Sequence, residues 1–340
     1  MSSAASEAQI DNELRLATEL RDKIIETNGT PNPIDIMKLL TAYEDIASKL
    51  RAPIAPQAQN TGSATSALLN INKAAKSVLL LPRKLSPKAS NKLSGLALSV
   101  LEHPAVFITP EMLGHFVDLH TILGRPEALP VAFNLYANKP MPIQGSKPLK
   151  FREPNPNKSA NAIEKSIADR ALQVAIDAKQ LVVAMDIVDT TYNTTAYRRA
   201  KFIKKALFPA VGLSLAPVAA YAVASKLAMY QTTMDPAVAT NIAFVGLCGY
   251  ITFTSVVGVV AVTTANDQME RITWTQGLPL RERWLREDER AAIDKMAMAW
   301  GFKELWKRGE EEGDEWEHLR EWVAARGMIL DKTELMEGME

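Results

Sequence analysis

Two long apolar stretches constrain this chain more than any other feature of its sequence. They cover Ala206–Ser225 and Ala237–Val262, and neither contains an aspartate, glutamate, lysine or arginine. Each has the roughly 20 residues that a helix rising about 1.5 Å per residue needs to cross a hydrocarbon layer about 30 Å thick. The short connection Lys226–Pro236 suits two antiparallel neighbours. The pattern predicts a transmembrane helical hairpin; the alternative is a buried helix pair in a large soluble domain, although such helices usually keep a polar stripe.

Basic residues gather directly before the first apolar stretch and predict its orientation. They are Arg198, Arg199, Lys201, Lys204 and Lys205, whereas the connection contains Lys226 as its one basic residue. Basic flanks normally stay in the compartment where the chain is made. We therefore expect both termini to face the cytosol, or the matrix if the protein is in the mitochondrial inner membrane.

The charge is unevenly distributed although the net charge is zero. Residues 1–205 hold 26 lysines and arginines against 19 aspartates and glutamates, and residues 267–340 hold 12 against 19. This asymmetry predicts a basic surface on the N-terminal part and an acidic C-terminal region.

The N-terminal sequence gives mixed information about location. Its first fifteen residues lack an apolar core and contain three acidic residues, which excludes an ordinary secretory signal and fits a mitochondrial transit peptide poorly. Further along, Ile46–Leu101 contains eight basic residues and no acidic one, as import signals do; a basic helical surface is the alternative. Together with the repeat resemblance below, this composition favours the mitochondrial inner membrane.

Apolar residues at helical spacing predict an all-α fold, because period-two alternation is not convincing outside the apolar stretches. We expect an N-terminal helix pair (1–52), a linker (53–65), a basic helical-repeat-like region (66–205), the hairpin (206–262) and an acidic, tryptophan-rich helical tail (263–340). The expected soluble helices are Glu7–Glu26, Pro33–Leu50, Ser66–Leu81, Ser86–Leu101, Thr109–Leu123, Pro126–Asn138, Ala160–Lys179, Gln180–Tyr192, Leu280–Arg308 and Glu310–Arg326. Thr109 is the expected N-cap of its helix, and Gly124 its end.

The segment Thr109–Pro140 has a more specific pattern, two amphipathic helices joined at Gly124-Arg125. Through Leu113-Gly114, the run Gly124–Leu129 and the closing Phe133–Pro140, it resembles one unit of the pentatricopeptide and tetratricopeptide repeat families. The resemblance implies a stacked helical surface for protein or RNA, and pentatricopeptide-like proteins often serve organelle gene expression. A regular tandem array is not evident, so protein docking is favoured over sequence-specific RNA reading.

Residues with catalytic or metal-binding chemistry do not form a recognisable motif. Cys248 is the single cysteine and lies in the second apolar stretch. His115 and His120 are five residues apart, about 140° on a helix, unlike the spacing of a zinc helix, and indicate surface histidines. The acidic run Glu310–Glu317 indicates a solvated helix start. We expect no catalytic residue, cofactor or metal.

Small and polar residues within the apolar stretches predict helix–helix packing. Gly246, Gly249 and Gly258 would allow close approach. Inter-helix hydrogen bonds are expected from Asn241, Tyr250, Thr252, Thr254 and Ser255. A pore would need several copies, and no charged residue marks an ion path.

Tryptophans concentrate after the second apolar stretch. Trp274 is a candidate anchor at the membrane interface, and the candidates for partner docking or tail packing are Trp300, Trp306, Trp316 and Trp322. The sequence favours a non-enzymatic inner-membrane scaffold or assembly factor that docks a protein complex, such as a respiratory complex. The alternatives are a membrane tether for mitochondrial RNA or the mitoribosome, and an oligomeric channel.

Overall fold

The computed structural model describes residues 2–25, 31–51, 87–142, 150–264 and 270–331. The chain forms two compact units. Unit 1 comprises residues 1–155 and 164–183, and unit 2 comprises residues 156–163 and 184–340. Residues 184–205, which the sequence groups with the basic helical region, therefore belong to the unit that contains the hairpin. The expected linker 53–65 and the expected helix Ser66–Leu81 lie outside the described residues.

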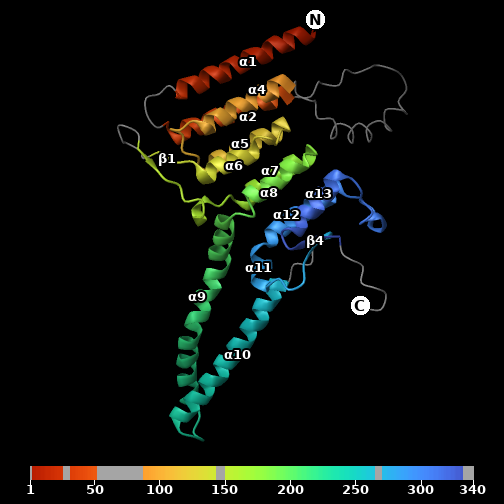
Figure 1. Ribbon diagram of the computed structural model, residues 1–340. Helices are drawn as coiled ribbons and strands as arrows, with labels where there is room; N and C mark the ends of the chain where they lie inside the picture. The colour runs from red at the N-terminus through yellow and green to blue at the C-terminus, as the bar shows by residue number, and fades with distance from the viewer. Residues whose placement is uncertain (1, 26–30, 52–86, 143–149, 265–269, 332–340) are drawn as a thin grey trace, which may run out of the picture. The chain divides into compact units, whose positions relative to one another are not determined.

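Unit 1 is a stack of helices, as the sequence predicts (Figure 1). Its helices are α1 (Ser2–Ile25), α2 (Pro33–Arg51), α4 (Pro87–Glu102), α5 (Pro110–Leu123), α6 (Leu129–Asn138) and α7 (Lys165–Asp177). Helix α1 packs on α2 and α4, and α5 packs on α2, α4, α6 and α7. Large side chains such as Tyr43, Phe116 and Phe133 are fully buried between these helices and form the core.

The predicted ends of α5 are confirmed. The Thr109 side chain accepts a hydrogen bond from the N–H of Met112, and Pro110 occupies the first turn. Gly124 ends the helix with a left-handed φ of 65°, which glycine adopts without steric cost, and its N–H donates to the carbonyl of His120. Local cap chemistry therefore sets this helix–turn–helix junction.

Two short strand pairs depart from the purely helical expectation. In unit 1, β1 (Met141–Pro142) pairs with β2 (Phe151–Arg152). In unit 2, β3 (Ile272–Trp274) pairs with β4 (Met328–Leu330), so the segment after the hairpin is joined to the last described residues. Three-residue strands carry too little alternation to be recognised in a sequence.

Unit 2 combines a long helical hairpin with smaller elements at one end of it. These are η1 (Ser159–Asn161), residues 184–190 of α8 (Leu181–Thr190), α9 (Thr195–Ala228), α10 (Pro236–Thr264), α11 (Leu280–Leu285), α12 (Glu287–Trp300), η2 (Leu305–Lys307) and α13 (Asp314–Ala324). The single helix predicted over Leu280–Arg308 is wrong, because the chain turns at Arg286 and leaves the helix at Gly301. The helix predicted over Glu310–Arg326 is shorter, since it begins only after Gly313.

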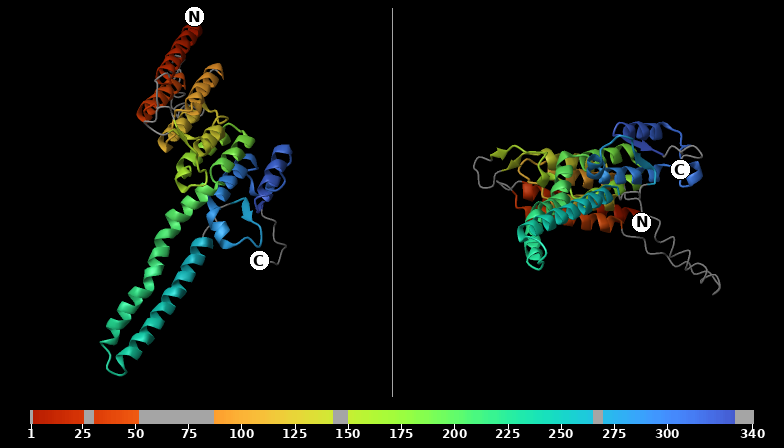
Figure 2. Two further views of the ribbon diagram at one scale, coloured as in Figure 1. Left: turned by 60° about the vertical axis from the view of Figure 1, so that its left-hand side comes forward. Right: turned by 90° about the horizontal axis from the view of Figure 1, so that it is seen from below.

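Helices α9 and α10 form the predicted hairpin. They lie side by side and project from the rest of unit 2 (Figures 1 and 2). Helix α9 continues through Pro209 and Pro217, and the Asp235 carboxylate accepts a 2.7 Å hydrogen bond from the N–H of Ala237 at the start of α10. Both helices are long and apolar enough to span a membrane, and almost none of their apolar residues are buried within the chain. The alternative of a buried helix pair does not describe this fold.

Candidate functional site

The two hairpin helices touch through alanines of α9. Ala220, Ala224 and Ala228, one turn apart, are at most 4% exposed, and Ala239 of α10 is also buried. Beside them the rings of Tyr221 and Phe244 meet edge to face, 5.9 Å apart. Small residues at four-residue spacing let two helix backbones approach closely in an apolar environment. The helix contact is therefore an alanine stripe close to the connection.

The predicted glycine contact is wrong. Gly246, Gly249 and Gly258 of α10 are exposed, and a Cβ added at any of them would meet nothing within 4 Å. The predicted inter-helix hydrogen bonds are also not found among the described contacts. Thr254 and Ser255 donate to carbonyls of their own helix, and the other three candidates, Asn241, Tyr250 and Thr252, are exposed.

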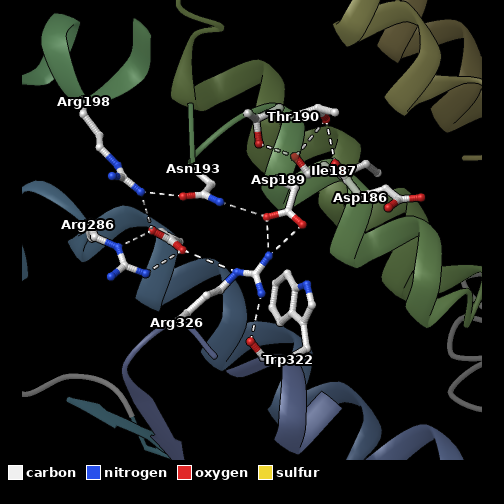
Figure 3. A network of polar contacts seen from close by, with 11 residues as sticks. Asp186, Ile187, Asp189, Thr190, Asn193, Arg198, Arg286, Trp322 and Arg326 are labelled. Atoms are coloured by element: carbon white, nitrogen blue, oxygen red, sulfur yellow. Dashed lines mark hydrogen bonds and ion pairs between the residues drawn. The ribbon is translucent and has the colours of Figure 1, made fainter. Parts of the chain in front are cut away.

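A ring of polar contacts locks the base of the hairpin, the end away from the connection (Figure 3). The guanidinium of Arg326 binds both oxygens of Asp189 through one nitrogen, at 2.5 and 2.7 Å. Asn193 donates to Asp189 and accepts a 2.5 Å bond from Arg198. The buried carboxylate of Glu289 closes the ring, 3.8 Å from both Arg198 and Arg326.

Two further arginine contacts reinforce this ring. Arg286 binds Glu289 through two nitrogens, at 2.8 and 3.1 Å, a bidentate geometry that fixes orientation. The guanidinium of Arg326 lies 3.6 Å from the ring centre of Trp322, a cation–π contact. Residues before the hairpin and residues after it are thus held together as one polar core.

A buried ion pair joins Lys201 of α9 to Asp288 of α12. Their side-chain atoms are 2.6 Å apart, with side-chain exposures of 6% and 11%. The Lys201 ammonium also lies 5.8 Å from the ring centre of Trp284 in α11. Because unpairing either buried charge is strongly unfavourable, this pair fixes α9 against the helices that follow the hairpin.

The five basic residues predicted to orient the hairpin differ in their surroundings. Arg198 and Lys201 are engaged in ion pairs with α12. Arg199 is on the surface and donates a 3.0 Å bond to the carbonyl of Asn157. Lys204 and Lys205 are exposed directly before the apolar stretch. Lys204 and Lys205 are therefore the two lysines of this set whose side chains are accessible.

A second polar centre follows the hairpin and is built on Arg271, whose side chain is fully buried. Its guanidinium binds Glu311 at 2.6 Å and Asp331 at 2.7 Å, and lies 4.7 Å from the ring centre of Trp316. Asp294 accepts from the backbone N–H groups of Arg271 and Ile272. This centre joins β3, α12, α13 and the end of β4.

Gly301 makes room for the Arg271 guanidinium. A Cβ at this position would lie 1.6 Å from Nη1 of Arg271 and 2.7 Å from a Glu311 oxygen. The backbone angle of Gly301, φ −83°, is open to any residue. Close approach of the charged group, not backbone conformation, therefore requires glycine here.

Glu311 also holds the ends of a loop, residues 302–310, which corrects the expectation of a fully solvated acidic run. Its carboxylate accepts 2.8 Å bonds from the N–H groups of Phe302 and Gly309. Burial would raise the pKa of Glu311, but these bonds and the one from Arg271 outweigh it and hold the pKa below its ordinary value. The carboxylate therefore stays ionised and keeps the loop in place.

This 302–310 loop presents apolar side chains to solvent. Leu305 is 75% exposed, Trp306 is 74% exposed and Phe302 is 42% exposed. The Lys307 ammonium lies 4.6 Å from the Trp306 ring centre. Of the other docking candidates, Trp316 is buried, Trp322 is covered by Arg326, and Trp300 is half-buried. Trp306 is therefore the tryptophan of this set that remains open to a partner.

The two histidines of α5, His115 and His120, each contact polar groups of neighbouring residues. His120 is buried, contrary to the expectation of a surface residue, and bonds through its ring to the Phe116 carbonyl and the Ser94 hydroxyl. His115 is half-buried and lies 2.9 Å from Glu44. Within the described ranges, no group of three or more histidines, cysteines or acidic residues is arranged to hold a metal ion.

The sequence contains partial signals for some of the contact residues that its motifs did not predict. Ala220, Ala224 and Ala228 recur at the spacing of a small-residue helix contact, and Arg286 and Glu289 are three apart on one helical face. Arg271, Asp189 and Arg326 gave no such signal, because their partners are distant in sequence.

Comparison of the chain with protein-family models, with curated proteins and with solved structures found no match.

Proposed function

We propose that this protein is a non-enzymatic membrane scaffold or assembly factor, anchored by the α9–α10 hairpin and docking a membrane protein complex through its soluble surfaces. The hairpin supports the anchoring role. Its outward side chains include Leu215, Val245 and Phe253, which are 60–69% exposed. Exposing such a side chain to water costs about 1.5–3 kcal/mol, so a lipid environment stabilises a hairpin that carries many of them.

The polar ring at the base supports one particular topology. Asp189 and Arg198 precede the apolar stretches, while Glu289 and Arg326 follow them, yet all four residues belong to one ring of contacts. A hairpin that crosses the membrane twice returns the chain to the side where it started. Both soluble flanks would then share one side, and the basic flank with Lys204 and Lys205 would keep them in the compartment of synthesis.

The mitochondrial inner membrane, with both termini in the matrix, is our proposal for the location. It is supported by the basic, acid-free composition of residues 46–101 and by the repeat-like pattern of Thr109–Pro140. The stacked helices of unit 1 are compatible with a surface for protein docking.

The exposed 302–310 loop is the observation that carries the docking role. Three apolar side chains, Phe302, Leu305 and Trp306, are held in a fixed loop by the buried Glu311–Arg271 pair. Protein interfaces take most of their binding energy from a few aromatic and apolar side chains. Such side chains bind more tightly when they are already held in place before the partner arrives. The loop has these properties.

Purification of the tagged full chain in mild detergent from isolated mitochondria tests this function. We expect subunits of a respiratory complex to copurify and to survive nuclease treatment. The double variant Leu305→Ser/Trp306→Ala should lose them, whereas the control Phe107→Ala, an exposed aromatic of unit 1, should not. Transcripts or ribosomal proteins lost on nuclease treatment would instead support the RNA-tether alternative. A partner retained equally by both variants would contradict docking through the loop.

A further inference from the structure

The facing sides of α9 and α10 are in contact near the connection but not at the base. On α9, Leu213 lies two turns before Ala220 on the same helical face, yet Leu213 is 44% exposed and Ala220 is 4% exposed. Phe202, five turns before Ala220 on that face, is 47% exposed. The contact therefore ends between Leu213 and Ala220.

Helix α10 shows the same change along its length. Ala243, Leu247, Ile251 and Ser255, half-buried at four-residue spacing, mark the face toward α9. Gly258 and Val262 lie two turns beyond Ile251 and Ser255 on this face. Val262 is 65% exposed, and a Cβ added to Gly258 would meet nothing within 4 Å. The two helices diverge toward the base (Figure 1), where α11 contacts both of them.

Three apolar positions on the facing sides are left uncovered, Leu213, Gly258 and Val262, and we call them the apolar wedge. A wedge of this kind inside a bilayer is filled by an acyl chain or by another helix, since water is excluded there. The three residues that define the wedge are aliphatic or lack a Cβ, and they offer no hydrogen-bonding side chain to a partner helix. Their chemistry fits an acyl chain.

A lysine lies at the mouth of the wedge. Lys205 precedes the first apolar residue of α9 and lies about 60° from the face of Ala220 on an ideal helix, whereas Lys204 lies about 160° from it. Both lysines are exposed. A cation at the start of a span is at the depth of the lipid phosphates, where each lysine or arginine contributes about a fivefold preference for anionic lipid.

We propose, building on the proposed membrane anchoring, that the base of the hairpin binds one anionic phospholipid, with an acyl chain in the wedge and its phosphate at Lys205. The lipid completes the packing that the two helices do not make with each other. It also sets the depth of the hairpin beside the polar ring that joins both flanks.

Native mass spectrometry of the full chain tests this. The protein is purified in non-ionic detergent with equal amounts of phosphatidylglycerol and phosphatidylcholine of the same acyl chains. We expect one retained phosphatidylglycerol, a loss of its preference by about fivefold in Lys205→Gln, and less than twofold in the matched control Lys204→Gln. Gly258→Leu should lose either lipid, while Gly249→Leu, on the opposite face of α10 and equally open, should retain it.

Other outcomes overturn the proposal. Equal retention of the two lipids, identical behaviour of the two lysine variants, or full retention in Gly258→Leu would do so. Release of the lipid by millimolar inorganic phosphate would indicate a free-anion site, and a copurifying protein that protects the wedge would indicate a partner helix. A chain extracted from membranes at alkaline pH would refute the anchoring itself, whereas a chain that stays inserted without bound lipid refutes only the lipid site.

Discussion

Arg326 and Asp189 are 137 residues apart in the chain, yet one guanidinium nitrogen of Arg326 lies 2.5 and 2.7 Å from the two carboxylate oxygens of Asp189. The hairpin lies between them in the sequence, so this contact joins the segment before it to the segment that follows α13. The pair is partly covered, with side-chain exposures of 15% and 36%. It links the folding of the two flanks.

Removal of this pair should loosen unit 2. We expect Arg326→Gln to lower the stability by about 2 kcal/mol, since a charge-assisted bond is lost and Asp189 is left without that partner. Thermal unfolding of the detergent-solubilised chain, followed by tryptophan fluorescence, measures the change. Arg320→Gln, at an exposed position of α13, serves as the control. Equal midpoints for the two variants would contradict the role given to the pair.

Gly301→Ala should be strongly destabilising although alanine is normally tolerated. The new Cβ would lie 1.6 Å from Arg271 Nη1, so the buried guanidinium must leave its carboxylate partners at a cost of about 3–5 kcal/mol. Gly95→Ala in α4 is the opposite case, with nothing within 4 Å, and should stabilise unit 1 by about 0.5–1 kcal/mol. Chemical denaturation of both variants tests these opposite signs.

Stability should fall in mild acid because of His120. Burial lowers its pKa from 6.5 to about 4, and the hydrogen bond to the Phe116 carbonyl and the charge of Glu127 only partly oppose this. The unfolded chain therefore binds a proton between pH 6.5 and 4 that the folded chain does not. The contribution of His120 to the free energy of unfolding is fully present above pH 6.5, and it declines by about 3 kcal/mol as the pH falls to 4.

The measurement for this prediction is urea unfolding at a series of pH values. His120→Leu should flatten the dependence in this window even if it lowers stability at all pH values. His115→Leu, at a half-buried position, should leave the His120 contribution in place. An unchanged slope in His120→Leu would contradict the assignment.

Ala224→Leu should separate the hairpin helices near the connection. Ala224 is fully buried between α9 and α10, so a leucine side chain cannot fit without moving one helix. Gly249→Leu on the outer face adds the same bulk without a neighbour. Cysteine cross-linking between positions 221 and 244 should fall sharply in the first variant and not in the second. Equal cross-linking in both would refute the alanine contact.

The sequence predicted those parts of the fold that local patterns encode. The apolar stretches correspond to α9 and α10, and the Thr109 and Gly124 caps correspond to the ends of α5. The contact between the hairpin helices was assigned to the wrong small residues, because small size alone does not tell which way a residue points. Gly249 faces open space, while Ala224 is buried.

The polar centres could not be predicted from local patterns. Arg271 finds Glu311 and Asp331, 40 and 60 residues further along the chain, and nothing in its neighbourhood distinguishes it from a surface arginine. The same holds for the ion pair between Lys201 and Asp288, which are 87 residues apart. Long-range ion pairs depend on tertiary packing, so the periodicity and spacing of residues in the sequence do not predict them.

Cysteine accessibility decides whether the hairpin crosses the membrane while both flanks stay on one side. In a Cys248→Ser background, single cysteines replace Thr233 in the connection or Glu317 in α13, both exposed positions. In sealed mitoplasts we predict that an impermeant maleimide labels Thr233→Cys at once and Glu317→Cys only after permeabilisation. Immediate labelling at both positions, or protection of both, would contradict the account.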